Sequence, residues 1–175
     1  MGFALAAHAQ DVVASAFGLR PSAGSSQRTV ALGASKGQVI QVLGAPSKTS
    51  RFYSEIDEKW WPLLQYGSNQ LYFNENKLAL AELSDARFTV GKPGTAGFHV
   101  GSVLPKAKPG SAKPAPAFGY FNVERKPGKS RNLSYSAISY GYMKTEKGQG
   151  LDVLYEIQYD HQGRVTHIAL DSTYD

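Results

Sequence analysis

The sequence predicts an α+β fold in which short helices pack on an antiparallel sheet of six to eight strands. Three observations support this prediction. The composition, with 18 glycines, 9 prolines and 10 tyrosines, favours strands and turns over a helical bundle. Residues 32–46 carry the start and stop signals of one short helix. Alternating apolar segments separated by turn residues then fill much of the remaining chain.

The helix is defined by its two ends. Ser35 and Gln38 have the spacing of a capping box, in which each side chain satisfies the other residue's backbone N–H. Gly44 can end the helix, and Pro46 prevents its continuation. Between these signals lies an apolar stripe made of Val39, Ile40, Val42 and Leu43. A helix of two to three turns is too short to be stable alone, so we expect it to pack on a sheet.

The first group of predicted strands lies between residues 49 and 83. Apolar runs at 63–66 and 70–73 are separated by the turn residues 67–69. The run at 70–73 is followed by Asn74–Lys77 and a further apolar run at 78–83, which predicts an antiparallel hairpin.

The last third of the chain predicts a three-stranded antiparallel meander over residues 133–145, 151–159 and 164–171. The apolar phase changes partway along the first of these strands, so we expect a β-bulge near Ala137. Asp160–Gly163 is a four-residue turn signal with glycine in the last position.

The N-terminal residues indicate export. Ala7-His8-Ala9 fits the small-x-small rule for signal peptidase, so residues 1–9 are interpreted as a signal-peptide remnant and residues 10–29 as a flexible leader. The alternative is a native Ala-rich helix over residues 3–17. We expect a periplasmic or secreted protein. No apolar run approaches the roughly 20 residues that a membrane-spanning helix needs.

The chain is 175 residues long and is divided here into an N-terminal α+β unit, residues 30–90, and the C-terminal meander, residues 132–175. A Pro/Lys-rich connection, residues 91–131, joins them, and residues 30–175 are expected to form one compact domain. Both halves run from a glycine-bearing opening through an aromatic strand to a tight turn and a return strand. Two tandem helix–sheet repeats are therefore one possible arrangement.

A short set of residues resembles a known family: Gly33-Ala34-Ser35, Val39, Leu43-Gly44-x-Pro46, Tyr66 and Leu71-x-Phe73-x-x-x-Lys77-Leu78. It resembles the periplasmic SmpA/OmlA (BamE-type) domains and the related β-lactamase-inhibitor-protein fold, in which two such units occur in tandem. The resemblance covers residues 30–83 well and 97–171 loosely. It implies helices packed on an antiparallel sheet and a function in binding another protein.

Catalysis finds little support in the motifs. The sequence contains no G-x-S-x-G elbow and neither of the common glycine-rich phosphate-binding motifs. An alternative hypothesis is a small periplasmic hydrolase that uses His99 or the acidic cluster Glu55, Asp57 and Glu58.

No cofactor and no metal site are predicted. The sequence has no cysteine, which excludes disulfides and thiolate metal sites within it and gives no support for a lipobox anchor. His161 and His167 lie near Asp160 and Asp171, but we interpret both imidazoles as solvent-exposed groups of a turn and a strand.

A basic segment lies within the connection and includes Lys106, Lys108, Lys113, Arg125 and Lys126. The aromatic residues Phe118, Tyr120 and Phe121 are interleaved with it. The segment is either a solvated loop or a contact for an acidic protein, a lipid headgroup or a polysaccharide. An exported protein seldom meets nucleic acid, so nucleic acid is not an expected partner.

Two sets of aromatic residues are the candidate binding residues. Trp60 and Trp61 precede Pro62, and a tryptophan pair in a loop is typical of an interaction hot spot. The alternative is that one indole packs on the predicted helix and the other caps the sheet edge. The second set is Tyr140, Tyr142, Tyr155 and Tyr159, which we expect to line a sheet face.

The predicted function is therefore non-enzymatic: an exported cell-envelope protein that binds another macromolecule, a protein above all, through its sheet face or its tryptophan loop. The second alternative to this function, besides the hydrolase, is a structural accessory domain of an envelope complex. The sequence does not indicate the oligomeric state.

Overall fold

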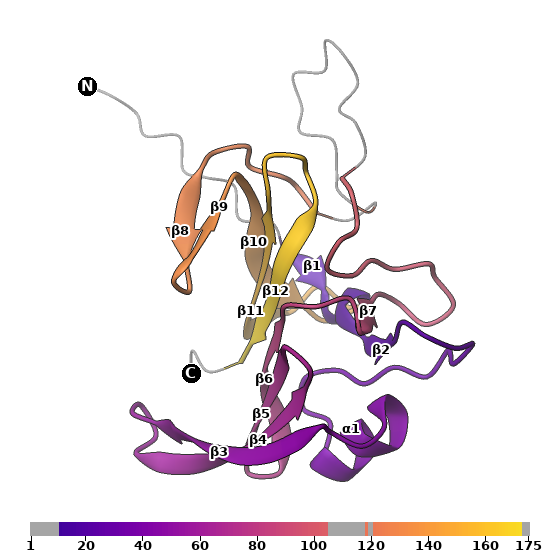
Figure 1. The fold of residues 1–175 in the computed structure, drawn as a ribbon, viewed down its shortest axis with the longest axis vertical. Helices are drawn as coiled ribbons and strands as arrows, with labels where there is room; N and C mark the ends of the chain where they lie inside the picture. Colours follow the sequence, from indigo (N-terminus) through magenta and orange to yellow (C-terminus); the bar gives the residue numbers. More distant parts are fainter. Residues whose placement is uncertain (1–10, 105–117, 119–120, 173–175) are drawn as a thin grey trace.

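The computed structural model describes residues 11–104, 118 and 121–172, and its centre is one eight-stranded sheet (Figure 1). The strand order is β1-β10-β11-β12-β6-β5-β4-β3. Neighbouring strands are antiparallel except β1 and β10, which are parallel. In this order the strands are Val12–Val13, Ala137–Lys144, Gly150–Tyr159, Val165–Asp171, Lys77–Leu83, Asn69–Asn74, Lys59–Tyr66 and Lys48–Ser54.

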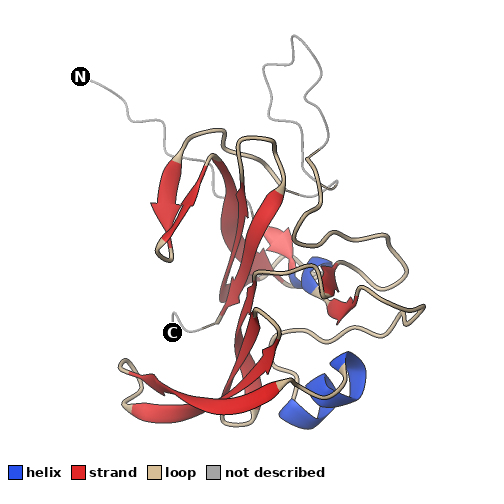
Figure 2. Ribbon diagram, viewed as in Figure 1, coloured by secondary structure: helices blue, strands red, loops and turns tan. Residues whose placement is uncertain are grey.

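The predicted α+β class is wrong, because the structure is mostly β. Strands make up 50% and helices 8% of it, and the large sheet is mixed (Figure 2). Among the described residues there is one α-helix, α1 (Lys36–Leu43), and one 3-10 turn, η1 (Ala14–Phe17). The described part of the second half contains no helix, so the tandem helix–sheet repeat is not formed either.

The main sheet joins two meanders that are far apart in the sequence. Strands β3 to β6 follow one another, as do β10 to β12, and the two groups meet where β6 pairs with β12. The sheet twists so strongly that β3 and β4 cross the bottom of Figure 1 while β10 to β12 run upward.

The apolar core lies on one face of this sheet. A row of directly paired residues crosses six strands on this face, and its members are Leu64, Leu71, Ala81, Leu170, Tyr155 and Gly141. The five side chains of this row are buried to 1% exposure or less. Because side chains alternate along a strand, the chain neighbours of these residues point to the opposite face of the sheet, outside this row.

Helix α1 covers only part of the core face. It contributes Val39 and Leu43 to the core. Further cover comes from η1, from a separate two-stranded sheet of β2 (Leu19–Pro21) and β7 (Phe88–Val90), and from connecting segments that contribute residues such as Phe98 and Phe121. The covering layer is therefore built mainly from short strands and turns, which is the physical reason why the α+β prediction fails.

The predicted capping box of α1 is confirmed. The Gln38 N–H donates to Ser35 Oγ at 3.3 Å, and the Ser35 N–H donates to Gln38 Oε1 at 2.9 Å. Gly44 ends the helix with φ of +86°, a value that favours glycine. Its carbonyl accepts a hydrogen bond from the Tyr66 hydroxyl at 3.0 Å, which ties the helix end to β4.

Residues 12–21 differ from the flexible leader predicted there. They form β1, η1 and β2, and Phe17 and Leu19 are buried to 2% and 0% exposure. Phe17 packs against Phe121 and Tyr155 with ring centroids 5.3 and 4.9 Å apart. The predicted signal remnant, residues 1–9, lies outside the described residues. No helix within the described residues is long and apolar enough to span a bilayer.

The predicted C-terminal meander is found, with one change at its start. Its first strand is divided at Ser136 into β9 (Leu133–Tyr135), which pairs with β8 (Gly128–Ser130), and β10. The register shift in the β10–β11 pairing lies between Tyr142 and Lys144, not near Ala137. The small β8–β9 hairpin stands over the sheet face opposite to the main core (Figure 1).

Candidate functional site

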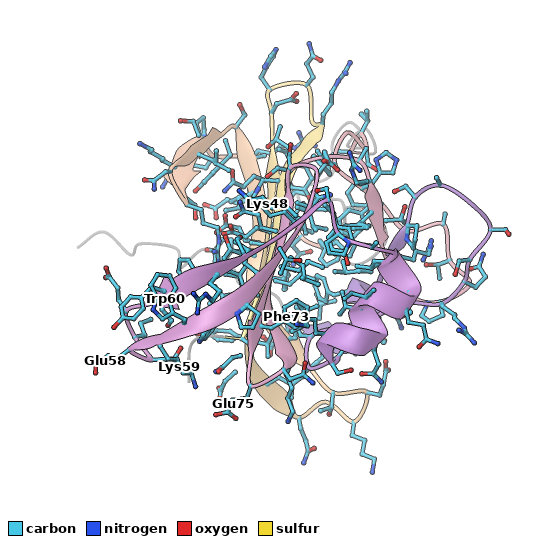
Figure 3. All side chains as sticks on the ribbon, turned by 60° about the horizontal axis from the view of Figure 1, so that its bottom comes forward. Lys48, Glu58, Lys59, Trp60, Phe73 and Glu75 are labelled. Atoms are coloured by element: carbon cyan, nitrogen blue, oxygen red, sulfur yellow. The ribbon has the colours of Figure 1, made fainter. Side chains whose placement is uncertain are left out.

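The exposed apolar side chains of the molecule gather on the β3–β4 hairpin, residues 48–66. Among the described residues seven large apolar side chains are exposed, and four of them belong to this hairpin. We call these four the hairpin surface: Phe52, Tyr53, Ile56 and Trp60, with exposures of 43%, 43%, 81% and 60%. Figure 3 shows Trp60 toward the free end of the hairpin, beside Glu58 and Lys59.

Strand alternation gives the two tryptophans different environments. Trp61 is 3% exposed and belongs to a second small apolar cluster with Leu63, Tyr72 and Ala79, on the face opposite to the main core. Trp60 is its neighbour in β4 and points to the other face, where it stays 60% exposed. Of the two tryptophans predicted as a binding pair, only Trp60 is therefore available to a partner.

Trp60 is held by contacts from β3. Tyr53 is directly opposite Trp60 in the sheet, and their ring centroids are 5.3 Å apart in an edge-to-face arrangement. The Arg51 guanidinium carbon lies 5.7 Å from the Trp60 ring centroid, within cation–π range. On the other face Phe52 packs edge-to-face on Tyr72, with centroids 5.2 Å apart. These contacts orient the hairpin surface while leaving it open to solvent.

The acidic cluster of the hydrolase alternative forms the turn of this hairpin. Asp57 Oδ2 accepts from the Ser54 hydroxyl at 2.7 Å, and the Asp57 N–H donates to the same Ser54 oxygen at 3.2 Å. Glu55 and Glu58 are exposed, and Glu58 has a φ of +53° as part of the turn. The structure thus assigns Asp57 a turn-forming hydrogen bond and leaves the two glutamates in solvent.

The four tyrosines predicted to line one face lie on two faces. Tyr155 and Tyr159 belong to the main core, at 1% and 0% exposure, and burial raises the pKa of both. The Tyr159 hydroxyl lies 3.0 Å from the Ser139 hydroxyl. Tyr140 is half-buried and Tyr142 is 49% exposed, both on the opposite face. Only Tyr140 and Tyr142 can meet a partner at the surface.

A polar cluster on the second face fastens the β8–β9 hairpin to the sheet. Arg131, at the hairpin tip, pairs with Glu82 of β6 at 3.0 Å and with Asp171 of β12 at 2.8 Å. Burial lowers the pKa of Arg131, but the nearby carboxylates, Asp171 above all, outweigh this effect and raise the pKa. Ser130 adds a hydrogen bond of 2.8 Å from its hydroxyl to Glu156 Oε2. Nothing in the sequence pattern indicated this cluster.

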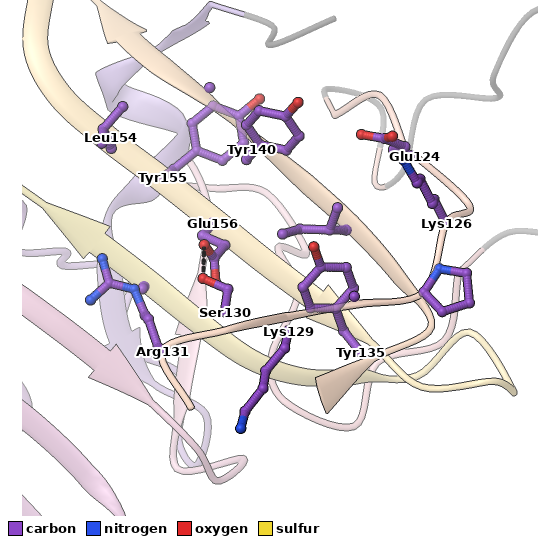
Figure 4. A pocket seen from close by; sticks show the side chains of 15 residues that line it. Glu124, Lys126, Lys129, Ser130, Arg131, Tyr135, Tyr140, Leu154, Tyr155 and Glu156 are labelled. Carbon is purple, nitrogen blue, oxygen red and sulfur yellow. Dashed lines mark hydrogen bonds between the residues drawn. The ribbon is translucent and has the colours of Figure 1, made fainter. Parts of the chain in front are cut away.

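A groove of about 770 Å³ lies between the β8–β9 hairpin and strands β10 and β11 (Figure 4). Both aromatic and charged side chains line it, among them Glu124, Lys126, Tyr135, Tyr140 and Glu156. Burial raises the pKa of Tyr135 and Tyr140, and nearby carboxylates raise it further. Acidic and basic groups are mixed along the groove, so it shows no single charge preference.

The histidines are separated from one another. His167 is 4% exposed and its Nδ1 lies 3.1 Å from the Ser84 hydroxyl, whereas His161 is exposed in the β11–β12 turn. The interpretation of His167 as a solvent-exposed group is thus wrong, and desolvation lowers the pKa of its imidazole. His99 Nδ1 lies 2.8 Å from the Val100 carbonyl oxygen. Within the described residues no three metal-ligating side chains are grouped.

The basic segment is described only in part. Lys106, Lys108 and Lys113 lie outside the described residues. Arg125 and Lys126 are exposed, and Lys126 lines the groove beside the β8–β9 hairpin.

Comparisons with protein-family models, with curated proteins and with solved structures find no match to this chain. The resemblance to the SmpA/OmlA domains and to the β-lactamase-inhibitor-protein fold therefore stays a prediction. The candidate site is defined by geometry, and its most distinctive part is the hairpin surface.

Proposed function

We propose that this chain is a non-enzymatic binding protein that engages another protein through the hairpin surface. The observation that carries the proposal is the clustering of four of the seven exposed large apolar side chains on one hairpin. Single exposed apolar residues are ordinary, but four of them gathered on the two faces and the turn of one hairpin are more typical of an interaction site. Tryptophan, tyrosine and arginine are also the residue types most enriched in interface hot spots.

Trp60 would contribute most to such an interface. A tryptophan side chain buries up to about 250 Å². With 60% of Trp60 exposed, about 150 Å² remains for a partner to cover, or about 4 kcal/mol at 25 cal/mol per Å². The neighbouring Tyr53 and Arg51 hold the indole in place, so less side-chain freedom is lost on binding.

The cellular setting of the proposal rests on the sequence alone. The Ala7-His8-Ala9 signal supports export to the periplasm or beyond, and a cell-envelope partner is proposed on that basis. The exposed Arg125 and Lys126 would allow additional contact with an anionic membrane or polysaccharide surface.

The proposal is tested by capture from soluble and envelope fractions of the source cells, followed by binding of the purified partner. Immobilised wild-type chain is compared with Trp60→Ala and with the control Tyr142→Ala, which removes an aromatic ring of 49% exposure on β10. We expect a protein that is retained by wild type and Tyr142→Ala but not by Trp60→Ala. Trp61 is kept in all variants because it belongs to a buried cluster.

Equal retention of every specific partner by wild type and Trp60→Ala would refute the proposal. Melting temperatures of the three proteins accompany the assay. Because Trp60 is mostly exposed, its replacement should leave the fold intact, and a loss of binding then reports the surface itself.

A further inference from the structure

We infer that strand β3 accepts an extended, acidic segment of the partner protein as an additional strand of the sheet. This inference rests on the proposed function, and it specifies how the partner binds and which chemistry it carries. It requires an available strand edge, a reason why that edge prefers a partner over a second copy, and side chains that select the segment.

The edge is available. Strand β3 is the last strand of the main sheet, and among the described residues no strand pairs with its outer side. In an antiparallel pair, alternate residues direct their N–H and C=O groups away from the partner strand. Part of the backbone of Lys48–Ser54 thus presents a row of donors and acceptors that an extended chain can satisfy.

This edge lacks the usual structural protection. Edge strands are commonly shortened, bulged or interrupted by proline, which prevents pairing with other chains. Strand β3 has seven residues without proline, and its seven consecutive pairs with β4 show no register shift. Charge is the remaining protection, and it is supplied by Lys48 and Arg51.

The charge of β3 decides between the occupants. The strand has two basic residues and no acidic one. Antiparallel pairing with β3 of a second copy, centred on Arg51, would place the two Arg51 side chains opposite each other, which is unfavourable. A strand that places a carboxylate beside Arg51 makes a favourable cross-strand pair. The acidic residues Glu55, Asp57 and Glu58 lie beyond β3 in the turn, so the preferred carboxylate position is near Arg51 and away from the turn.

The side chains of β3 also determine what should flank that carboxylate. Arg51 and Tyr53 point to the face of Trp60, whereas Phe52 points to the face of Trp61. Arg51 is held near the Trp60 ring at 5.7 Å and keeps an exposed guanidinium. A matching segment therefore carries an acidic residue beside Arg51 and β-branched residues such as valine and threonine beside Phe52 and Tyr53.

The charge preference is tested with three nine-residue peptides that alternate valine and threonine and differ only in the central residue: Glu, Gln or Lys. Binding is followed by tryptophan emission, which reports Trp60 because Trp61 is already buried. We expect the Glu peptide to bind about fivefold more tightly than the Lys peptide, as follows from an exposed cross-strand charge pair. In Arg51→Glu the order of the two peptides should reverse. An unchanged order in that variant would overturn the inference.

The strand geometry is tested by amide hydrogen exchange of the full chain with and without the captured partner. Strand addition predicts slower exchange within residues 48–54 in the complex. Unchanged exchange there would overturn the inference, even if Trp60→Ala abolishes binding and the proposed function stands. Failure of the proposed function is seen separately, as partner binding that Trp60→Ala does not weaken.

A second copy as the occupant is tested by light scattering of the free chain over a range of concentrations. We expect a molecular mass that does not rise with concentration, which means that β3 does not pair with β3 of a second copy. Concentration-dependent dimerisation that slows exchange within residues 48–54 without any partner would overturn the inference.

Discussion

Replacing Arg131 with alanine removes the side chain that joins the β8–β9 hairpin to the main sheet. Arg131 makes two ion pairs, at 3.0 Å to Glu82 and 2.8 Å to Asp171. The side chains of Arg131 and Glu82 are about one-quarter exposed, at 24% and 25%, whereas that of Asp171 is only 6% exposed. The cluster is therefore nearer to a buried ion pair than to a surface one.

These exposures set the expected loss of stability. Removing one partner of a fully buried pair costs about 3–5 kcal/mol, and an exposed pair contributes at most about 1 kcal/mol. We therefore expect Arg131→Ala to lower the free energy of unfolding by about 2–3 kcal/mol. For a chain of this size that corresponds to a fall in Tm of about 5–10 °C. The hairpin amides should also exchange faster, because the hairpin loses its main attachment.

The assay is thermal and urea denaturation of Arg131→Ala beside the control Lys129→Ala, which removes an exposed cation from the same hairpin. The control should stay within about 0.5 kcal/mol of wild type. If the two variants melt within about 2 °C of each other, Arg131 does not stabilise the structure in the way that its contacts indicate.

Two further predictions concern buried aromatic residues. Trp61→Ala should lower the free energy of unfolding, measured by urea denaturation, by about 3–5 kcal/mol because it empties the centre of the second apolar cluster. Trp61→Phe should lower it much less, since the buried indole N–H that it removes has no partner in the described structure. Equal losses in the two variants would contradict this prediction. Burial raises the pKa of Tyr66 and Tyr72 to about 12, above the ordinary value near 10. The folded state thus favours the neutral phenols. The stability that they contribute is complete below pH 10 and is lost as the pH rises from 10 through 12. Urea midpoints that stay constant between pH 9 and 11.5 would contradict this prediction.

Local features could be predicted from the sequence because neighbouring residues determine them. The Ser35–Gln38 capping box and the Asn74–Lys77 turn were both found where expected. In that turn Glu75 and Asn76 have φ of +48° and +63°, as a tight hairpin turn needs. The strands of the C-terminal meander were also found, because alternation specifies a strand without reference to its partners.

The fold class could not be predicted, since it depends on contacts between distant segments. Whether helices or short strands cover the core face is decided by the pairing of β2 with β7, whose residues are about 70 positions apart. The same limit applies to Arg131, which meets its partners 49 and 40 residues away. Hydrophobic patterning cannot indicate which distant carboxylates an arginine will meet.

The candidate site was predictable in composition but not in orientation. The Trp60–Trp61 pair was identified from residue type, yet alternation along β4 exposes one indole and buries the other. Likewise Tyr142 is exposed while Tyr155 lies in the core. Assigning the faces requires knowledge of which side of the sheet is covered, and that depends on residues 12–21 and 88–104.

The central claim is that the hairpin surface binds a protein, and the ratio of Kd values of the purified partner for Trp60→Ala and wild type tests it most directly. A hot spot of at least about 2 kcal/mol predicts a Kd at least about 30-fold higher for Trp60→Ala, with an unchanged Tm and with Tyr142→Ala close to wild type. A Kd that Trp60→Ala leaves within about twofold of wild type would contradict the claim.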